Sequence, residues 1–422
     1  MSGYRHNHYV PEWYQRRFML PGQTRYYRLD LKPEEMVREG HKYKRKALHH
    51  WSPEKVFAQD DLYTTKWGTI PNTEIEQFFF GRLDAEAKEA VQYWTEFDYQ
   101  HFSEEHFNAL MVYMSVQKMR TPKGLAYLSA VSKTGTNVTL IVLQEIRNLY
   151  CAVWTEAIWQ IAHAMDSPTK FIISDHPVTV YNRACPHLSK WCLGFNDPDI
   201  RMNGSHTFFP LSLEKVLILT NVSWLRNPYQ NELTLRPNPE YMRNTVFCFT
   251  DVQTERKLTE DEVLQINLIT KRRAYRYIAA AEEEWLYPER HVSTDHWRKL
   301  GGGYLLMPEP RRVYMGGEIF VGYKGGGSEG WGEYGYRPWQ KGFKDEKRHE
   351  MESETLERFK AEWAMLHGPK HTAICESFGG RGVGEDSEDM MRHYREVAQR
   401  YRRRSGHALF RRAVTERGRV ER

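Results

Sequence analysis

The chain has 422 residues, a mean hydropathy of −0.71 and a formal net charge of +5, values typical of a water-soluble protein with one or two domains. No apolar run approaches the roughly 20 residues that a membrane-spanning helix needs, so we expect no membrane contact. The first residues lack the apolar core of a signal peptide and the five cysteines lie far apart, so we expect a reduced, cytoplasmic protein.

The chain opens with the triplet His6-Asn7-His8, the letters that name a class of metal nucleases. Such a nuclease draws its three residues from separate points of a hairpin and a helix. Neighbouring residues of an extended chain point alternately to opposite sides, so the triplet itself predicts no such site. His6→Ala and Asn7→Ala should therefore both be nearly silent. A short helix is predicted from about Pro11, because proline suits the first helical turn.

Three helices are predicted in the next part of the chain. The first follows Asn72 and keeps an apolar period of 3.6 residues as far as Trp94. The second begins after Ser103, a residue that can cap it, and ends at Pro122, where proline interrupts helical hydrogen bonding. The third spans about residues 138–165 and is apolar enough to be a central element.

The pattern then changes to short strands over 170–175, 178–181, 207–211 and 216–220. A fourth helix begins at Thr259, where Thr-Glu-Asp-Glu is a capping box. Long helices followed by clustered strands predict an α+β fold, with a helical layer (about 72–165 and 259–280) packed against a small mixed β-sheet. We assign residues 1–285 to this core domain.

The composition changes after about residue 285. Residues 286–345 are rich in glycine and aromatic residues, which predicts a connecting segment that lies over a surface. Residues 346–422 are predicted to be helical and rich in arginine. Both ends of the chain are basic, which indicates either contact with nucleic acid or a tail that keeps the protein soluble. The candidate nucleic-acid-binding residues are Arg402, Arg403, Arg404, Arg411 and Arg412.

Motifs of known chemistry are scarce. Cys185, His187 and Cys192 offer three metal ligands in one loop, but no second pair at zinc spacing follows. The strongest local signal is Ser174-Asp175-His176-Pro177 at the end of an apolar strand, where a scaffold presents side chains to a loop. An aspartate there can bind a metal, act as a base or orient a histidine, or it can hydrogen-bond its own turn.

Five short segments stand out along the chain. They are His8-Tyr9-Val10-Pro11 with Phe18, Gln117-x-x-Arg120-Thr121-Pro122, Phe171 to Val178, Phe209 to Ser212, and the late helix with Asn267 and Ala274. Together they resemble successive signatures of one bacterial family, domain-of-unknown-function family forty-two thirty-eight, over about residues 6–280 and in the family's order. The family has no known mechanism, so the resemblance implies no reaction, and the position of His176 is often Asn in the family.

The polar members of these segments form our candidate site. If they converge, Asp175 orients His8 or holds a divalent ion such as Mg²⁺ or Mn²⁺, and Arg120 faces an anion. Gln117, Asn267 and Ser174 would then be binding residues that position the substrate. The sequence leaves a second interpretation open, in which these residues form a buried polar network that locks the helices to the sheet.

The leading hypothesis from the sequence is a cytoplasmic nucleic-acid-directed hydrolase. It would be a metal-dependent phosphodiesterase or nuclease, acting as an effector in bacterial defence or a toxin system. The alternative is a non-catalytic module that binds nucleic acid or, through its C-terminal region, a protein partner. The two differ in whether the polar residues meet in an open pocket.

Overall fold

A computed structural model describes residues 5–405, apart from gaps at 39–40, 68–69, 193–194, 196, 231–232, 237–238, 243–244, 246, 314–317, 323, 333–345 and 371–385. The helices are α1 (Glu12–Arg16), α2 (Gly81–Thr95), α3 (Glu104–Arg120), α4 (Pro122–Ser132), α5 (Thr136–Glu145), α6 (Cys151–Thr155), α7 (Val222–Arg226), α8 (Glu260–Arg273), α9 (Glu346–His367) and α10 (Glu388–Ser405). The strands are β1 (His6–His8), β2 (Tyr26–Asp30), β3 (Glu35–Arg38), β4 (His41–Lys44), β5 (Leu48–Trp51), β6 (Ala58–Asp60), β7 (Thr65–Trp67), β8 (Ile70–Asn72), β9 (Ile158–His163), β10 (Ile173–Ser174), β11 (Thr179–Asn182), β12 (Ser205–Pro210), β13 (Lys215–Thr220), β14 (Tyr277–Ala280), β15 (Glu318–Gly322) and β16 (Ser328–Gly332).

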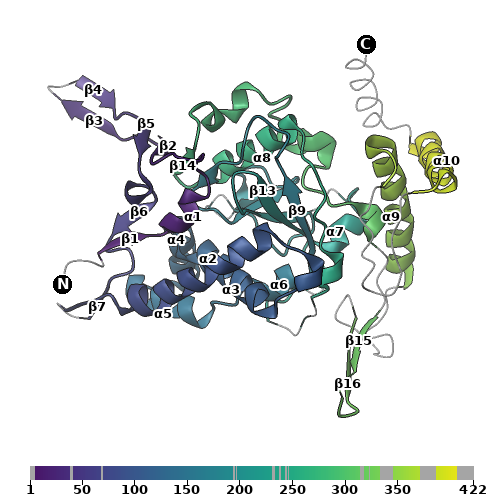
Figure 1. The fold of residues 1–422 in the computed structure, drawn as a ribbon, viewed down its shortest axis with the longest axis horizontal. Helices are drawn as coiled ribbons and strands as arrows, with labels where there is room; N and C mark the ends of the chain where they lie inside the picture. Colours follow the sequence, from purple (N-terminus) through teal and green to yellow (C-terminus); the bar gives the residue numbers. More distant parts are fainter. Residues whose placement is uncertain are drawn as a thin grey trace.

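The predicted α+β class is confirmed: a layer of helices packs against small antiparallel sheets. The two larger sheets have the strand orders β11-β12-β13-β9 and β10-β14-β2-β5. In Figure 1, β9 and β13 lie between α8 on one side and α2, α3 and α6 on the other. The layers are joined by polar as well as apolar contacts, since the indole of buried Trp154 donates a hydrogen bond to Thr207 on β12 at 3.0 Å.

The helices α3 and α8 begin at the capping residues that the sequence predicts. The Ser103 side chain accepts the His106 N–H at the start of α3, and Thr259 forms a complete capping box with Glu262 on α8. Each cap satisfies N–H groups that the first helical turn leaves without intrahelical partners. Proline ends α3 as predicted, but the chain immediately begins α4, which the sequence analysis did not predict.

The corner between α3 and α4 is unusually tight. Thr121 separates the two helices and caps α4 by accepting the Gly124 N–H. A Cβ atom at Gly124 would lie 2.3 Å from the Lys118 carbonyl oxygen, so only glycine fits there. This close approach places the end of α3 and the first turn of α4 beside one another.

One helix prediction is wrong in its second half. Residues 138–165 do not form a single helix, because α5 ends at Glu145, α6 is short, and Ile158–His163 is the strand β9. β9 pairs along its whole length with β13. A short apolar run suits a buried strand and a buried helix equally, and here the pairing with β13 decides. The helix predicted to reach 280 similarly ends at Arg273, where Tyr277–Ala280 becomes β14.

The predicted helical region near the C-terminus contains α9 and α10. Phe359 and Trp363 of α9 pack against Trp224 of α7, so α9 lies against the body of the protein, and α10 packs on α9 (Figure 1). Trp297 and Leu300 belong to the main hydrophobic core, although they follow residue 285. None of the described helices is both long and apolar enough to cross a membrane.

Candidate functional site

Three of the predicted site residues, His8, Gln117 and Arg120, lie near one another beside β1. Arg120 is fully buried and donates to both carboxylate oxygens of Asp84, at 2.7 and 3.2 Å. Its Nε donates to Gln117 Oε1 at 2.6 Å, and Gln117 in turn donates to the Tyr9 carbonyl at 2.8 Å. Gln117 therefore joins α3 to the segment that follows β1, with no donor or acceptor directed at solvent.

A second carboxylate faces this ion pair. Glu76 lies in a π-helical turn before α2, and burial raises its pKa to about 7. Burial also raises the pKa of Asp84, against the opposing charge of Arg120 and a smaller effect of His8. His8 itself lies 3.1 Å from the Glu54 carbonyl and 3.7 Å from Glu12, and burial lowers its pKa. His8, Gln117 and Arg120 thus belong to one charged cluster.

Asp175 has a different environment. It is buried, and its carboxylate accepts three backbone N–H groups from the start of β14: Tyr275 at 2.9 Å, Arg276 at 2.7 Å and Tyr277 at 2.8 Å. Burial raises the pKa of Asp175, while these three donors oppose the shift. The neighbouring Ser174 hydroxyl accepts the His176 N–H at 3.2 Å. Asp175 therefore ties the end of β10 to the start of β14.

Asn267 has a similar role from α8. Its side chain accepts the Ile172 N–H at 3.2 Å and donates to the Lys170 carbonyl at 2.9 Å, which fastens the segment before β10 to the helix. Neither Asp175 nor Asn267 forms a hydrogen bond or ion pair with His8 or Arg120. The candidate site residues therefore divide into two separate groups. Most of their polar atoms serve the buried network that the sequence analysis kept as its second interpretation.

The His-Asn-His triplet gives a direct test of side-chain direction along β1. His6 is exposed, whereas Asn7 is buried and its side-chain oxygen accepts the Tyr63 N–H at 3.2 Å. We expect Asn7→Ala to lower the free energy of unfolding by about 1–3 kcal/mol, because a buried N–H loses its acceptor. His6→Ala should cost less than about 1 kcal/mol, since its partner Asp60 is also exposed. Urea denaturation of both variants measures the difference.

Equal stability of these two variants would contradict this assignment. From the sequence, both substitutions were expected to be nearly silent, and the burial of Asn7 changes the prediction for that residue. An alternating strand pattern predicts that Asn7 points away from its neighbours, but not that this side is the buried one.

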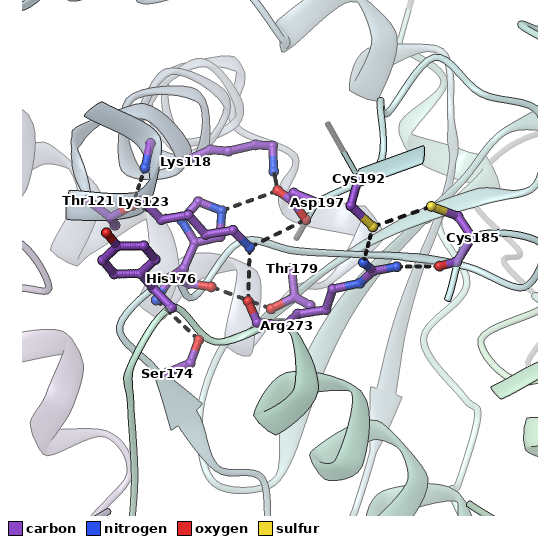
Figure 2. Close-up of polar contacts among 12 residues, drawn as sticks. Lys118, Thr121, Lys123, Ser174, His176, Thr179, Cys185, Cys192, Asp197 and Arg273 are labelled. Atoms are coloured by element: carbon purple, nitrogen blue, oxygen red, sulfur yellow. Dashed lines mark hydrogen bonds and ion pairs between the residues drawn. The ribbon is translucent and has the colours of Figure 1, made fainter. Parts of the chain in front are cut away.

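The cluster of polar side chains best suited to chemistry lies elsewhere, at the corner of α3 and α4 (Figure 2). There the Asp197 carboxylate forms ion pairs with Lys118 and, at 3.8 Å, with Lys123, and it forms a hydrogen bond at 3.3 Å with the imidazole of His176. The tight turn at Gly124 brings the two lysines together, and His176 follows β10. All three of these partners are buried.

The pKa values of Asp197, Lys123 and His176 are strongly shifted. Burial opposes ionisation of Asp197, but the ammonium groups of Lys118 and Lys123 outweigh it and hold the pKa of Asp197 well below its usual range. Burial lowers the pKa of Lys123 to about 8. Burial and the charge of Lys123 lower the pKa of His176 to about 3, so the imidazole is neutral at pH 7. Strongly shifted pKa values that gather in one place are typical of functional sites.

The hydrogen bonds of His176 define its tautomer. Nε2 faces the Asp197 carboxylate, which can only accept, so a neutral ring carries its hydrogen there. Nδ1 is then the acceptor for the Thr121 hydroxyl at 2.7 Å. The remaining oxygen of Asp197, Oδ1, is buried and accepts no hydrogen bond from the residues that the structure describes.

This group forms one wall of a pocket, which we call the lysine pocket. It encloses about 540 Å³ of space, which includes open solvent at its mouth. Aromatic rings form the other walls. The lining residues are Lys118, Met119, Lys123, Gly124, Tyr127, Tyr150, His176, Phe195, Asp197, Pro198, Asp199, Ile200 and Tyr241.

The sequence analysis did not select Lys118, Lys123 or Asp197. Lys118 and Lys123 lie on either side of the Arg120-Thr121-Pro122 signature, and that position was the one signal available for them. Asp197 stands alone in a loop, and nothing local connects it to α3. His176 was noted only as a departure from the family pattern.

The structure describes the candidate metal ligand Asp175 and some of the candidate nucleic-acid-binding arginines. Within the described part of the chain, no cluster of three or more His, Cys, Asp or Glu side chains is arranged to hold a metal ion, Asp175 included. Arg402 is exposed on α10, and Arg403 and Arg404 continue that helix. Arg411 and Arg412 lie outside the described residues.

Comparison with known proteins gives a family without an assigned activity. A family model described as Protein of unknown function (DUF4238) matches residues 6–138 and 149–284. No curated protein and no solved structure gives a significant match. The match covers both groups of polar residues and the lysine pocket, so any function of the pocket has to be inferred from its own geometry.

Proposed function

The chain belongs to DUF4238, a family of proteins of unknown function, and from the geometry of the lysine pocket we propose that it is a nucleic-acid-directed hydrolase. One observation carries the proposal. Two ammonium groups, Lys118 and Lys123, and a neutral imidazole, His176, all face the Asp197 carboxylate at the wall of an aromatic pocket.

Each part of this arrangement suits a phosphodiester substrate. A phosphodiester carries one negative charge, like the Asp197 carboxylate, so it can replace that carboxylate as the partner of Lys118 and Lys123. The rings of Tyr127, Phe195 and Tyr241 line the same pocket and offer flat apolar surfaces on which a base can stack.

The proton acceptors are adjacent to the lysines. Among the residues that the structure describes, none donates a hydrogen bond to the buried Asp197 Oδ1. The ammonium groups of Lys118 and Lys123 hold the pKa of Asp197 low, but a phosphate that pairs with them offsets their charge, so the carboxylate can then accept a proton from an attacking water. His176 orients the other oxygen of the same carboxylate. A cytoplasmic location and a role as an effector in bacterial defence or a toxin system belong to this proposal. They rest on the spacing of the cysteines and the basic ends of the chain.

The alternative function is a non-catalytic module that binds nucleic acid or protein, and a specific observation favours it. The charge of Asp197 is already balanced by Lys118 and Lys123, and His176 is hydrogen-bonded to the same carboxylate. An imidazole with a pKa of about 3 is a weak base. A pocket of this kind can bind a phosphate without cleaving it. Catalysis and binding therefore have to be measured separately.

The test is incubation of the full chain with labelled single-stranded DNA and RNA oligonucleotides, with and without Mg²⁺ or Mn²⁺. We expect binding and cleavage, and we expect Lys118→Met to weaken binding about 10- to 100-fold, because a charge-assisted hydrogen bond to phosphate is lost. Affinity should also fall as the pH rises through about 8, where Lys123 loses its proton, and Lys123→Met should lack this fall.

The matched control is Lys257→Met, which removes an exposed lysine paired with exposed Asp166. Its affinity should stay near that of the wild type. Binding without cleavage under every metal condition would support the non-catalytic module. The absence of both binding and cleavage would contradict the hydrolase and the nucleic-acid-binding module.

A further inference from the structure

Two cysteines lie side by side next to the lysine pocket. The sulfur atoms of Cys185 and Cys192 are 3.5 Å apart, and both side chains are buried (Figure 2). The loop between them closes through backbone hydrogen bonds, with Cys192 N–H donating to the Ser189 carbonyl at 3.0 Å. The fold therefore holds the two thiols nearly in contact without a covalent bond.

A buried arginine contacts the sulfur atom of Cys192. Arg273, at the end of α8, places Nη1 2.9 Å from Cys192 Sγ and donates from Nη2 to the Cys185 carbonyl at 2.6 Å. A guanidinium cannot lose its charge in a protein, so burying it favours a negative partner nearby. The Cys192 sulfur is placed to be that partner as a thiolate.

The two thiols differ in acidity. The hydrogen bond from Cys185 lowers the pKa of Cys192, and the charge of Arg273 acts in the same direction. The pKa of Cys185 is raised by its hydrogen bond to Cys192 and by burial. The other described cysteines are unlike this pair, because burial raises the pKa of Cys151 and Cys248 is exposed. The thiolate is the reactive form of cysteine.

We infer that Cys185 and Cys192 form a reversible oxidation site, in which a peroxide converts the two thiols to a disulfide. The Cys192 thiolate attacks one peroxide oxygen and the O–O bond breaks, leaving sulfenic acid on Cys192 and releasing hydroxide, which takes a proton to become water. The Cys185 sulfur then attacks Cys192, expels a second hydroxide and loses its own proton to it. Two thiols and one hydrogen peroxide thus give one disulfide and two waters.

The contact with Arg273 makes this disulfide easy to reduce. In the reduced protein the guanidinium lies beside a thiolate, whereas in the oxidised protein the Cys192 sulfur is uncharged and Arg273 keeps its hydrogen bond to the Cys185 carbonyl. Because the interaction stabilises the reduced form, it raises the reduction potential of the pair. The site is therefore a labile one and differs from a structural disulfide. This inference does not depend on the proposed hydrolase function.

The test treats the full-length protein with hydrogen peroxide and follows each cysteine by peptide mass mapping. We expect the Cys185 and Cys192 peptides to become joined with the loss of two hydrogen atoms, and reduced glutathione to restore both thiols. Cys151 should remain free. Mapping also separates Cys375, which lies outside the described residues, from the pair.

A second variant keeps the outcome interpretable. Cys185→Ser removes the resolving thiol, so Cys192 should accumulate as sulfenic acid that a dimedone probe labels, while Cys192→Ser should give no such label at Cys185. Peroxide is small, whereas a bulky thiol reagent should modify exposed Cys248 before either buried cysteine. The inference fails if Cys185 and Cys192 keep free thiols while Cys248 is oxidised, or if glutathione does not reduce the joined peptides.

Discussion

Asp197→Asn is expected to bind oligonucleotides more tightly than the wild type and to cleave them at least about 100-fold more slowly, since a general base contributes on that order. The amide has the size of the carboxylate but no charge, so Lys118 and Lys123 lose the internal anion that competes with a phosphate. The same change removes the buried oxygen Oδ1 as a proton acceptor. Filter binding and single-turnover cleavage, measured on one preparation, separate the two effects.

The substitution also leaves two buried cations without their partner, which costs roughly 3–5 kcal/mol when a buried ion pair is broken. Thermal melts must therefore show that the variant is folded at the assay temperature. Asp389→Asn, which changes an exposed carboxylate on α10, serves as the control and should bind and cleave like the wild type. If Asp197→Asn cleaves normally, the catalytic role of the lysine pocket is wrong. If it binds no more tightly, Asp197 does not compete with the ligand.

The second large effect concerns stability. Asp175→Ala should lower the free energy of unfolding by roughly 3–5 kcal/mol, because three buried N–H groups lose a charged acceptor together. Asp175→Asn should cost clearly less, since its side-chain oxygen can still accept from β14. Chemical denaturation with urea measures both, and Asp166→Ala, at an exposed carboxylate, should stay within about 0.5 kcal/mol of the wild type.

This prediction separates the two roles considered for Asp175. A catalytic or metal-binding Asp175 would give Ala and Asn variants that are folded and equally inactive. A structural Asp175 gives a graded loss of stability, with any loss of activity in proportion to unfolding. Stable, inactive variants of both kinds would return Asp175 to the candidate active site.

Much of the fold follows from local chemistry that the sequence displays. Ser103, Thr259 with Glu262, and Pro122 begin or end helices because capping and the missing proline N–H act within one turn of the chain. The short apolar run of β13 likewise indicates a strand. The α+β class follows from such signals, and so does the meeting of Gln117 and Arg120, which are one helical turn apart on α3. The family follows from the resemblance of short segments.

Contacts between distant residues decided the rest. Residues 158–163 are a strand because β13 supplies partners more than fifty residues away, and an apolar run cannot indicate whether such a partner exists. Asp175 is a structural acceptor because the N–H groups of Tyr275, Arg276 and Tyr277 arrive from about a hundred residues further along the chain. No local pattern around Asp175 contains that information.

The lysine pocket and the cysteine pair show the same limit. Lys118 and Lys123 are close in sequence, but burial lowers the pKa of Lys123, and their ammonium groups lower the pKa of Asp197, which a separate loop brings to them. Cys192 gains its arginine from the end of α8. By itself the sequence determined the residue types and the local elements that carry them. Only the tertiary structure decided which charges share a low-dielectric interior, because Coulomb energies there depend on distances between segments that no local spacing sets.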